Sequence, residues 1–332
     1  MMGSYTLRKI KSGIFYRLRL NERLRHWDDE RYLRLLFRVR TGGRLDLRSP
    51  ETFSQKLQWL KLRDRQSIYT TLVDKHDVKA WVTNLVGESH VVPTLGVWSS
   101  FDEIDFGALP EQFVLKCTHD SGGLVICDDP SAFDVETSRT KINRAMARNY
   151  YHSGREWPYK DVVPRILAEV YLPTWTPERG SASAEDALLP TSAGSIEISD
   201  SSVSRNGLID YKFYCFHGEP KFLYVSQGLH DHDTARMDFL TLDWELADFA
   251  RPDYTHFIDL PEKPVGFAKM IDMARQLSRD IPFVRVDLFE HFGQVLFSEM
   301  TFHPVSGMMP IQPRSAEFEL GQFLDLSAVE QY

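Results

Sequence analysis

The fold is decided near the C-terminus by two runs, Phe283-Val-Arg285-Val-Asp287-Leu-Phe289 and Val295-Leu-Phe297-Ser-Glu299-Met-Thr301. A short glycine-containing turn separates them, so the chain can fold back on itself as a hairpin. Side chains alternate between the two faces of a strand, which places Arg285 and Asp287 on one face. A pairing centred near Gly293 predicts Asp287 opposite Glu299 and Arg285 opposite Thr301.

Two carboxylates directly opposite each other on a ladder repel, unless a cation lies between them. We therefore expect Asp287 and Glu299 to hold a metal ion, and hard oxygen ligands favour Mg²⁺. Magnesium beside an arginine is typical of phosphate chemistry, which makes Arg285 a candidate catalytic residue. The alternative is an amphipathic strand pair whose polar face lies in water.

A second hairpin is predicted from residues 113–117 and 124–127, which flank the turn His119-Asp-Ser121-Gly122-Gly123. The ammonium group of Lys116 could reach one phosphate, while the backbone N–H groups of Ser121, Gly122 and Gly123 close over the next. An ordinary hairpin turn is the alternative, because Ser-Gly-Gly turns are common.

Three more charged residues are candidates for binding a nucleotide. Lys75 lies just inside a predicted helix start, although a surface lysine is the default there. Glu169 ends an apolar strand predicted over residues 164–172, a suitable place for a hinge that hydrogen-bonds a base; a carboxylate on the rim is the alternative. Lys212 lies in an aromatic strand, residues 210–216, and needs a charged partner or water.

Composition indicates a folded, cytoplasmic protein. Of the residues, 42% are apolar and 26% charged, as in ordinary soluble chains. The three cysteines lack zinc or redox spacing, and no apolar run approaches the length of a membrane helix. We find no Gly-x-Ser-x-Gly elbow, His-Glu-x-x-His motif or Walker loop, and we expect no nucleic-acid partner.

Charge is distributed unevenly along the chain. The formal net charge is -8, but residues 1–48 hold 13 Lys/Arg and 5 Asp/Glu, a net of +8. Basic residues within 8–25 alternate with apolar ones, so they could form an amphipathic helix on anionic lipid or on a partner such as a glycosyltransferase, at the inner face of a membrane. We favour a solvated helix face docked on the acidic body.

The pattern predicts an α+β protein with four parts. A helical N-terminal region spans residues 1–95, and a lobe carrying the glycine turn spans 96–172. Residues 173–208 are rich in Ser, Ala, Pro, Gly and Thr, which indicates a flexible insertion. The C-terminal lobe, 209–332, carries the predicted metal site.

Taken together, these and neighbouring stretches resemble the TupA-like branch of the ATP-grasp superfamily, which is associated with teichuronopeptide and surface-polysaccharide biosynthesis. The matching stretches are Phe53-Ser-Gln-Lys-Leu-Gln-Trp59-Leu-Lys-Leu, Asp74-Lys75, Gly96-Val-Trp98, Phe113-Val-Leu-Lys116-Cys-Thr-His119-Asp-Ser-Gly-Gly123, Gly154-Arg-Glu-Trp-Pro-Tyr-Lys160, Asp210-Tyr-Lys-Phe, Arg285-Val-Asp287 and Ser298-Glu-Met-Thr-Phe-His-Pro304. The resemblance implies an ATP-grasp fold, in which two α+β lobes clamp ATP.

The resemblance also implies roles for individual residues. Lysines at the positions of Lys75, Lys116 and Lys212 would hold the triphosphate under a glycine lid, residues 121–123. Glu169 and the backbone near Leu172 would bind adenine. The metal ligands would be Asp287, Glu299 and, where many members have asparagine, Thr301; Arg285 would lie beside the reacting acyl group.

The activity implied by the resemblance is ATP-dependent carboxylate–amine ligation through an acylphosphate, with ATP and Mg²⁺ as cofactors. The partners would be an amine or amino acid and a carboxylate of a small molecule or surface-glycan precursor, such as a uronic acid or a peptide side chain. Two alternatives remain open: a kinase that phosphorylates a sugar or polyol hydroxyl, and a non-catalytic nucleotide-binding scaffold for glycosyltransferases.

Overall fold

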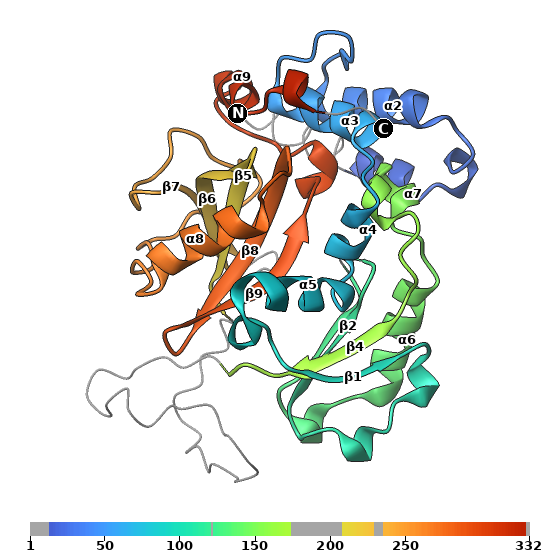
Figure 1. Ribbon diagram of the computed structural model, residues 1–332. Helices are drawn as coiled ribbons and strands as arrows, with labels where there is room; N and C mark the ends of the chain where they lie inside the picture. Colours follow the sequence, from blue (N-terminus) through green and yellow to red (C-terminus); the bar gives the residue numbers. More distant parts are fainter. Residues whose placement is uncertain (1–12, 121, 174–207, 229–234, 330–332) are drawn as a thin grey trace.

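A computed structural model describes residues 13–120, 122–173, 208–228 and 235–329. Residues 13–19 are helical. The α-helices after them are α2 (Asp29–Thr41), α3 (Phe53–Arg63), α4 (Ile68–Val73), α5 (Asp77–Val86), α6 (Val135–Met146), α7 (Tyr151–Gly154), α8 (Phe267–Leu277) and α9 (Ser315–Gln322). Two antiparallel sheets complete the fold, which is α+β as expected (Figure 1).

The first sheet has the strand order β1-β4-β2-β3, with bounds β1 (Thr94–Trp98), β4 (Ile166–Val170), β2 (Phe113–Cys117) and β3 (Leu124–Cys127). The predicted hairpin is therefore present, as β2 and β3. Every second residue of β2 is buried, and Leu115 and Cys117 pack with Ile142 of α6. One face of this sheet is thus covered by α6, and β1 was not among the predicted strands.

The second sheet has the order β7-β6-β5-β8-β9, with bounds β7 (Arg236–Thr241), β6 (Glu219–Gln227), β5 (Asp210–Phe216), β8 (Phe283–His291) and β9 (Gln294–Thr301). The register places Asp287 of β8 opposite both Lys212 of β5 and Glu299 of β9. A bulge follows Asp287 on this ladder. The predicted C-terminal hairpin and its pairing are confirmed.

Helices cover both faces of the second sheet. One face, which includes Phe213, Val225 and Val286, packs against α8 and, near β9, against α4 and α5. Figure 1 shows α5 between the two sheets. Residues of α4 and α5 therefore contribute to the hydrophobic core under the second sheet. The N-terminal end of α5 lies beside the first sheet.

The opposite face of the second sheet is divided along its length. At one end α3 covers it: Phe53 packs on Tyr214, Phe216 and Phe283, with ring centroids 6.4, 5.6 and 5.1 Å apart. Thr52 caps α3 and forms a capping box with Gln55. At the other end of the same face the side chains are charged, and Lys75 links this end to the β2–β3 turn of the first sheet.

The N-terminal helices pack on this body. Phe15, in the helical segment 13–19, is fully buried in a cluster with α2 and Met308. Arg19 donates a hydrogen bond to the carbonyl oxygen of Ser153. The described part of the basic segment is thus docked through Phe15, whereas residues 8–12 lie outside the described residues.

Two other expectations concern the organisation of the chain. The expected end of the helical region, residue 95, lies within β1, and α2 and α3 pack on the C-terminal half of the chain. Of the segment 173–208, residues 174–207 lie outside the described residues. Among described helices, none is both long and apolar enough to span a bilayer.

Candidate active site

The guanidinium group of Arg285 lies between the two opposed carboxylates of the β8–β9 hairpin. Its Nε and Nη2 atoms donate to Oδ1 and Oδ2 of Asp287, both at 2.6 Å. Nη2 also lies 3.4 Å from Oε1 of Glu299 and 3.0 Å from the hydroxyl oxygen of Thr301. The cation between the acids is therefore an arginine, so their opposition does not by itself require a metal ion, contrary to the sequence argument.

Lys212 has the charged partner that its aromatic strand demanded. Its Nζ atom lies 2.7 Å from Oδ2 of Asp287 and 3.2 Å from Oδ1 of Asp210. Burial would lower the pKa of Lys212, but the two aspartates outweigh it and raise the pKa above its ordinary value. Complete burial raises the pKa of Asp287, and Arg285 and Lys212 counter this effect. Three charge-assisted hydrogen bonds from Arg285 and Lys212 favour the ionised form of the Asp287 carboxylate.

Glu299 is the more accessible of the two acids, with 31% of its side chain exposed. Partial burial favours the neutral form, but Lys75, Lys212 and Arg285 together lower the pKa of Glu299 to about 2. The carboxylate is therefore ionised at neutral pH, and it faces several cations.

Lys75 joins the two lobes. Its Nζ atom donates to the carbonyl oxygen of Asp120, in the β2–β3 turn, at 2.5 Å and lies 3.7 Å from Oε2 of Glu299 on β9. Its backbone N–H donates to the carbonyl oxygen of Thr118. One lysine thus contacts the glycine turn of the first lobe and the acidic hairpin of the second.

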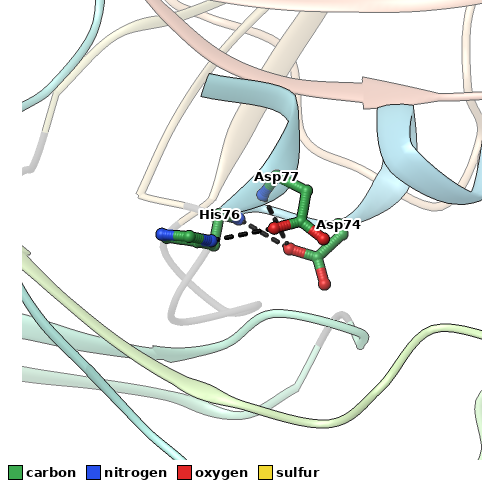
Figure 2. Close-up of side chains that lie close together, drawn as sticks. All are labelled: Asp74, His76 and Asp77. Atoms are coloured by element: carbon green, nitrogen blue, oxygen red, sulfur yellow. Dashed lines mark hydrogen bonds and ion pairs between the residues drawn. The ribbon is translucent and has the colours of Figure 1, made fainter. Parts of the chain in front are cut away.

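A polar cluster at the start of α5 fixes the backbone around Lys75 (Figure 2). Figure 2 shows Asp74, His76 and Asp77 close together, with Oδ1 of Asp74 accepting from the N–H groups of His76 and Asp77. These are potential metal ligands. However, Nη2 of Arg165 already lies 2.9 Å from Asp74 and 2.7 Å from Asp77, so a protein cation already pairs with both carboxylates. We interpret the cluster as a structural ion-pair network that connects α5 to the first sheet.

Glu169 lies in the interior of the first sheet, between β1 and β2, and it is 5% exposed. Its two carboxylate oxygens lie 2.5 Å from the Nζ atoms of Lys79 and Lys116. Burial would raise the pKa of Glu169, but these two ammonium groups lower it below its ordinary value. Sequence reasoning missed Lys79, although its position four residues after Lys75 places it one helical turn further along the same segment.

Leu172 lies just beyond β4, where the two lobes meet. It packs against Val92, Phe289 and Leu296 in a small apolar cluster. Phe289 and Leu296 belong to β8 and β9, so this cluster joins the end of the first sheet to the second. A hinge near Glu169 and Leu172 stays a prediction at this junction.

The glycine turn is only partly open. Ser121 lies outside the described residues. A Cβ atom on Gly122 would meet nothing closer than 3.7 Å. On Gly123 it would lie 2.7 Å from Cβ of Cys117 and 2.8 Å from Cβ of Ala145. Gly123 therefore allows close packing against β2 and α6, whereas a Cβ atom on Gly122 would make only an ordinary van der Waals contact with Asp120.

Behind the hairpin, the loop after β9 rests on buried charged residues. Val305, Ser306 and Gly307 all have positive φ, which is unusual for valine. Nζ of Lys61 donates to the carbonyl oxygens of Gly154 and Ser306, at 2.8 and 2.7 Å, and to the hydroxyl of Ser306 at 3.1 Å. Lys61 of α3 thus fixes the position of this loop through hydrogen bonds.

Glu156 completes this buried network. Its carboxyl is fully buried, which raises its pKa, while Lys61 and Arg19 act in the opposite direction. Burial lowers the pKa of Lys61 to about 7, although Glu156 counters the effect. His303 is also buried, and burial lowers its pKa well below the usual range, so the ring is neutral. Neither Lys61 nor Glu156 was predicted, because their partners are distant in sequence.

One protein family matches most of this chain. The family described as TupA-like ATPgrasp matches residues 55–178 and 195–325, well over half of the chain. No curated protein sequence matches this chain.

The solved structures that match the chain include the following three. D-alanine–D-alanine ligase from Bacillus anthracis, complexed with ATP, is 11% identical with a TM-score of 0.39, over 76% of this chain and 63% of that chain. The ATP-grasp ligase PsnB, complexed with a minimal precursor, is 10% identical with a TM-score of 0.35, over 72% and 54%. The D-cycloserine synthetase DcsG is 15% identical with a TM-score of 0.35, over 76% and 69%. The chain thus spans less than two thirds of the first of these structures.

Proposed function

The chain belongs to the TupA-like ATP-grasp family, and from this premise we propose that it is an ATP-dependent ligase that joins a carboxylate to an amine. The observation that carries the proposal is the convergence of Lys75, Lys212 and Arg285 on the acidic pair of the β8–β9 hairpin. Cations and carboxylates from both lobes at one place suit a triphosphate and its counterion.

The nucleotide would lie between the two sheets. Lys75, Lys116 and Lys212 would pair with its phosphates, and the turn at Gly122 and Gly123 would cover them. For Lys116 this requires exchange of its ion pair with Glu169 for a phosphate oxygen. Glu169 and the backbone near Leu172 would bind the adenine, beside the apolar cluster that joins the lobes.

The oxygen donors of the hairpin fit a magnesium ion. A carboxylate offers about four lone-pair positions, and Arg285 and Lys212 occupy three of those on Asp287. Glu299 accepts from Arg285 and is partly exposed. We propose Asp287 and Glu299 as the ligands, with the hydroxyl of Thr301 as a third oxygen. A magnesium ion there would neutralise the β- and γ-phosphate oxygens.

The proposed chemistry has two steps. A carboxylate oxygen attacks the γ-phosphorus of ATP, which releases ADP and forms an acylphosphate; an amine then attacks the acyl carbon, which releases phosphate and forms the amide. Arg285, held rigid by Asp287, would stabilise the oxyanion of the tetrahedral intermediate. Closure of the lobes would exclude water, which otherwise hydrolyses the acylphosphate.

We further propose that the carboxylate belongs to a surface-glycan precursor, such as a uronic acid or a peptide side chain, and that the amine is an amino acid or a related amine. Family membership supports this substrate class.

The test is a phosphate-release screen of the purified protein with ATP and Mg²⁺, in which amino acids are crossed with uronic acids and nucleotide-linked uronic acids. ADP and phosphate should form in equal amounts, and only when both an amine and a carboxylate are present. Phosphoryl transfer to a sugar or polyol hydroxyl without an amine would identify a kinase instead. Absence of ADP with every pair, from protein that binds ATP, would support the scaffold alternative.

A further inference from the structure

A basic cavity lies at the C-terminal end of α2, away from the candidate active site. It has a volume of about 660 Å³, and it is lined by Arg34, Arg38, Gly43, Arg44, Leu45, Asp46 and Arg48. Four arginines and one aspartate give the lining a net charge of +3. This concentrates, in one place, the positive charge of the N-terminal segment in a chain whose net charge is -8.

Within the described residues, most of these arginines have no ion-pair partner. Arg34 pairs with Glu30 of the preceding helical turn and donates to the carbonyl oxygen of Leu45 at 2.6 Å. By contrast, Arg38, Arg44 and Arg48 form no ion pair with any residue that the structure describes. Like charges around one cavity repel each other, and an anion bound among them would relieve that repulsion.

The walls of the cavity are held in place without a ligand. Gly42 ends α2 with a left-handed conformation, φ 77°, which turns the chain back along the helix. Leu45 and Leu47 are buried in the adjoining core. Oδ1 of Asp46 accepts from the N–H groups of Arg48 and Ser49, at 2.8 and 3.1 Å. The loop that carries Arg44 and Arg48 is therefore shaped before any anion arrives, which lowers the entropic cost of binding.

The cavity is separate from the proposed nucleotide site. None of its lining residues belongs to that site, and Figure 1 shows α2 at the opposite end of the molecule from β1, β2 and β4. The triphosphate proposed above would contact Lys75, Lys116 and Lys212, so it does not account for these arginines.

We propose that this cavity binds a diphosphate group. A planar guanidinium donates two parallel hydrogen bonds to phosphate oxygens, and three guanidinium groups without an ion pair to any described residue exceed the requirement of a single phosphate. The net charge of the lining matches the two to three negative charges of a diphosphate ester or pyrophosphate near neutral pH. A diphosphate of this kind can be carried by a nucleotide-linked sugar or by a lipid. The inference rests on α2 and its loop alone and does not depend on the ligase proposal.

The test is titration calorimetry with inorganic pyrophosphate on the full chain. A triple variant, Arg38→Ala, Arg44→Ala and Arg48→Ala, should bind at least a hundredfold more weakly than the wild type, because each charge-assisted contact contributes on the order of tenfold. A matched variant, Arg144→Ala, Arg275→Ala and Arg279→Ala, loses the same charge from exposed arginines on and beside α6 and α8 and should bind normally. Lys75→Met removes a proposed phosphate contact of the active site and should leave cavity binding unchanged.

Two further arms identify the source of the diphosphate. A uridine diphosphate sugar tests a soluble carrier, and phosphatidylcholine vesicles containing farnesyl diphosphate test a lipid one; preference for either supports the proposal and names its carrier. Equal pyrophosphate affinity in the wild type and the triple cavity variant would overturn the proposal. So would equal binding to phosphatidylserine vesicles that carry no diphosphate. Because the three arginines are exposed, an unchanged thermal midpoint should show that the variant remains folded.

Discussion

The ammonium group of Lys75 lies 3.7 Å from the carboxylate of Glu299, which brings the start of α5 against the end of β9. The same group donates a hydrogen bond to the carbonyl oxygen of Asp120 in the β2–β3 turn, so one side chain contacts both lobes. A ligand with several negative charges would replace these internal contacts and keep the lobes together through its own phosphates. The distance between Lys75 and Glu299 is therefore a structural measure of how the proposed cleft closes.

Glu299→Gln should reduce ATP-dependent turnover by on the order of 10²–10³-fold, since a neutral amide cannot replace the charge that faces the proposed metal and phosphates. The variant should also lose stability near pH 7, because the surrounding cations favour the ionised carboxylate that the amide replaces. ADP formation and the thermal midpoint measure the two effects. Glu219→Gln, at an exposed ion pair with Arg275, is the matched control and should retain activity. Wild-type turnover in the Glu299 variant would remove this residue from the site.

Asp287→Asn should act strongly on stability as well as on turnover. Its carboxylate is fully buried between Arg285 and Lys212, so the change leaves two buried cations poorly compensated. Breaking a buried ion pair from one side costs about 3–5 kcal/mol. Equilibrium unfolding in urea measures the loss, and a variant within experimental error of the wild type would contradict the buried ion network.

Acid should remove the contribution of Glu299 to stability. Its pKa in the folded protein is about 2, below the ordinary value of 4.5, so the unfolded chain binds a proton first as the pH falls. The contribution is complete above about pH 4.5 and is lost progressively toward pH 2. The difference in unfolding free energy between the wild type and Glu299→Gln should change over this interval. A difference that is constant from pH 7 to pH 2 would show that the surrounding cations do not lower this pKa.

Lys61 and Glu156 should be energetically coupled. Lys61→Met removes three hydrogen bonds and leaves Arg19 to counter the burial of Glu156; at about 1 kcal/mol for each bond, we expect it to cost about 3 kcal/mol. Glu156→Gln leaves the converse defect. In a double-mutant cycle measured by denaturant unfolding, the double variant should lose clearly less than the sum of the two single changes. Strict additivity would show that the two groups do not stabilise each other.

Adjacent glycines of the turn should respond differently to alanine. Gly123→Ala forces a methyl group against Cys117 and Ala145 and should cost about 1–3 kcal/mol. Gly122→Ala adds a methyl group at ordinary contact distance from Asp120 and should stay within about 0.5 kcal/mol. Urea unfolding compares them. Equal effects would indicate that the turn repacks freely around position 123.

The local sequence pattern predicted those structural elements whose contact partners lie close to them in the sequence. Alternation and a glycine turn were sufficient to give the β8–β9 hairpin and the pairing of Asp287 with Glu299. The prediction that the acids need a metal was less secure, because periodicity cannot show that Arg285 bends back between them. The placement of an aromatic strand around Lys212 did indicate a charged partner, and that partner is Asp287.

Contacts between distant segments could not be predicted in this way. Lys61 meets Ser306 across 245 positions, and Arg165 meets Asp74 across 91, so no local window contains both partners. The strand β7 was also missed; it lies at the edge of its sheet, and part of the preceding connection lies outside the described residues. Global packing, rather than propensity, decides these features.

The burial of Phe53 beneath Phe283 has a consequence for biosynthesis. A ribosome delivers α3 long before the strands that it covers, so the nascent chain must carry an uncovered aromatic surface until β5, β6 and β8 have emerged. The N-terminal segment that contains α3 therefore cannot complete its folding alone. Truncation of the polypeptide before α3 or before β8 would leave this aromatic surface without its packing partner.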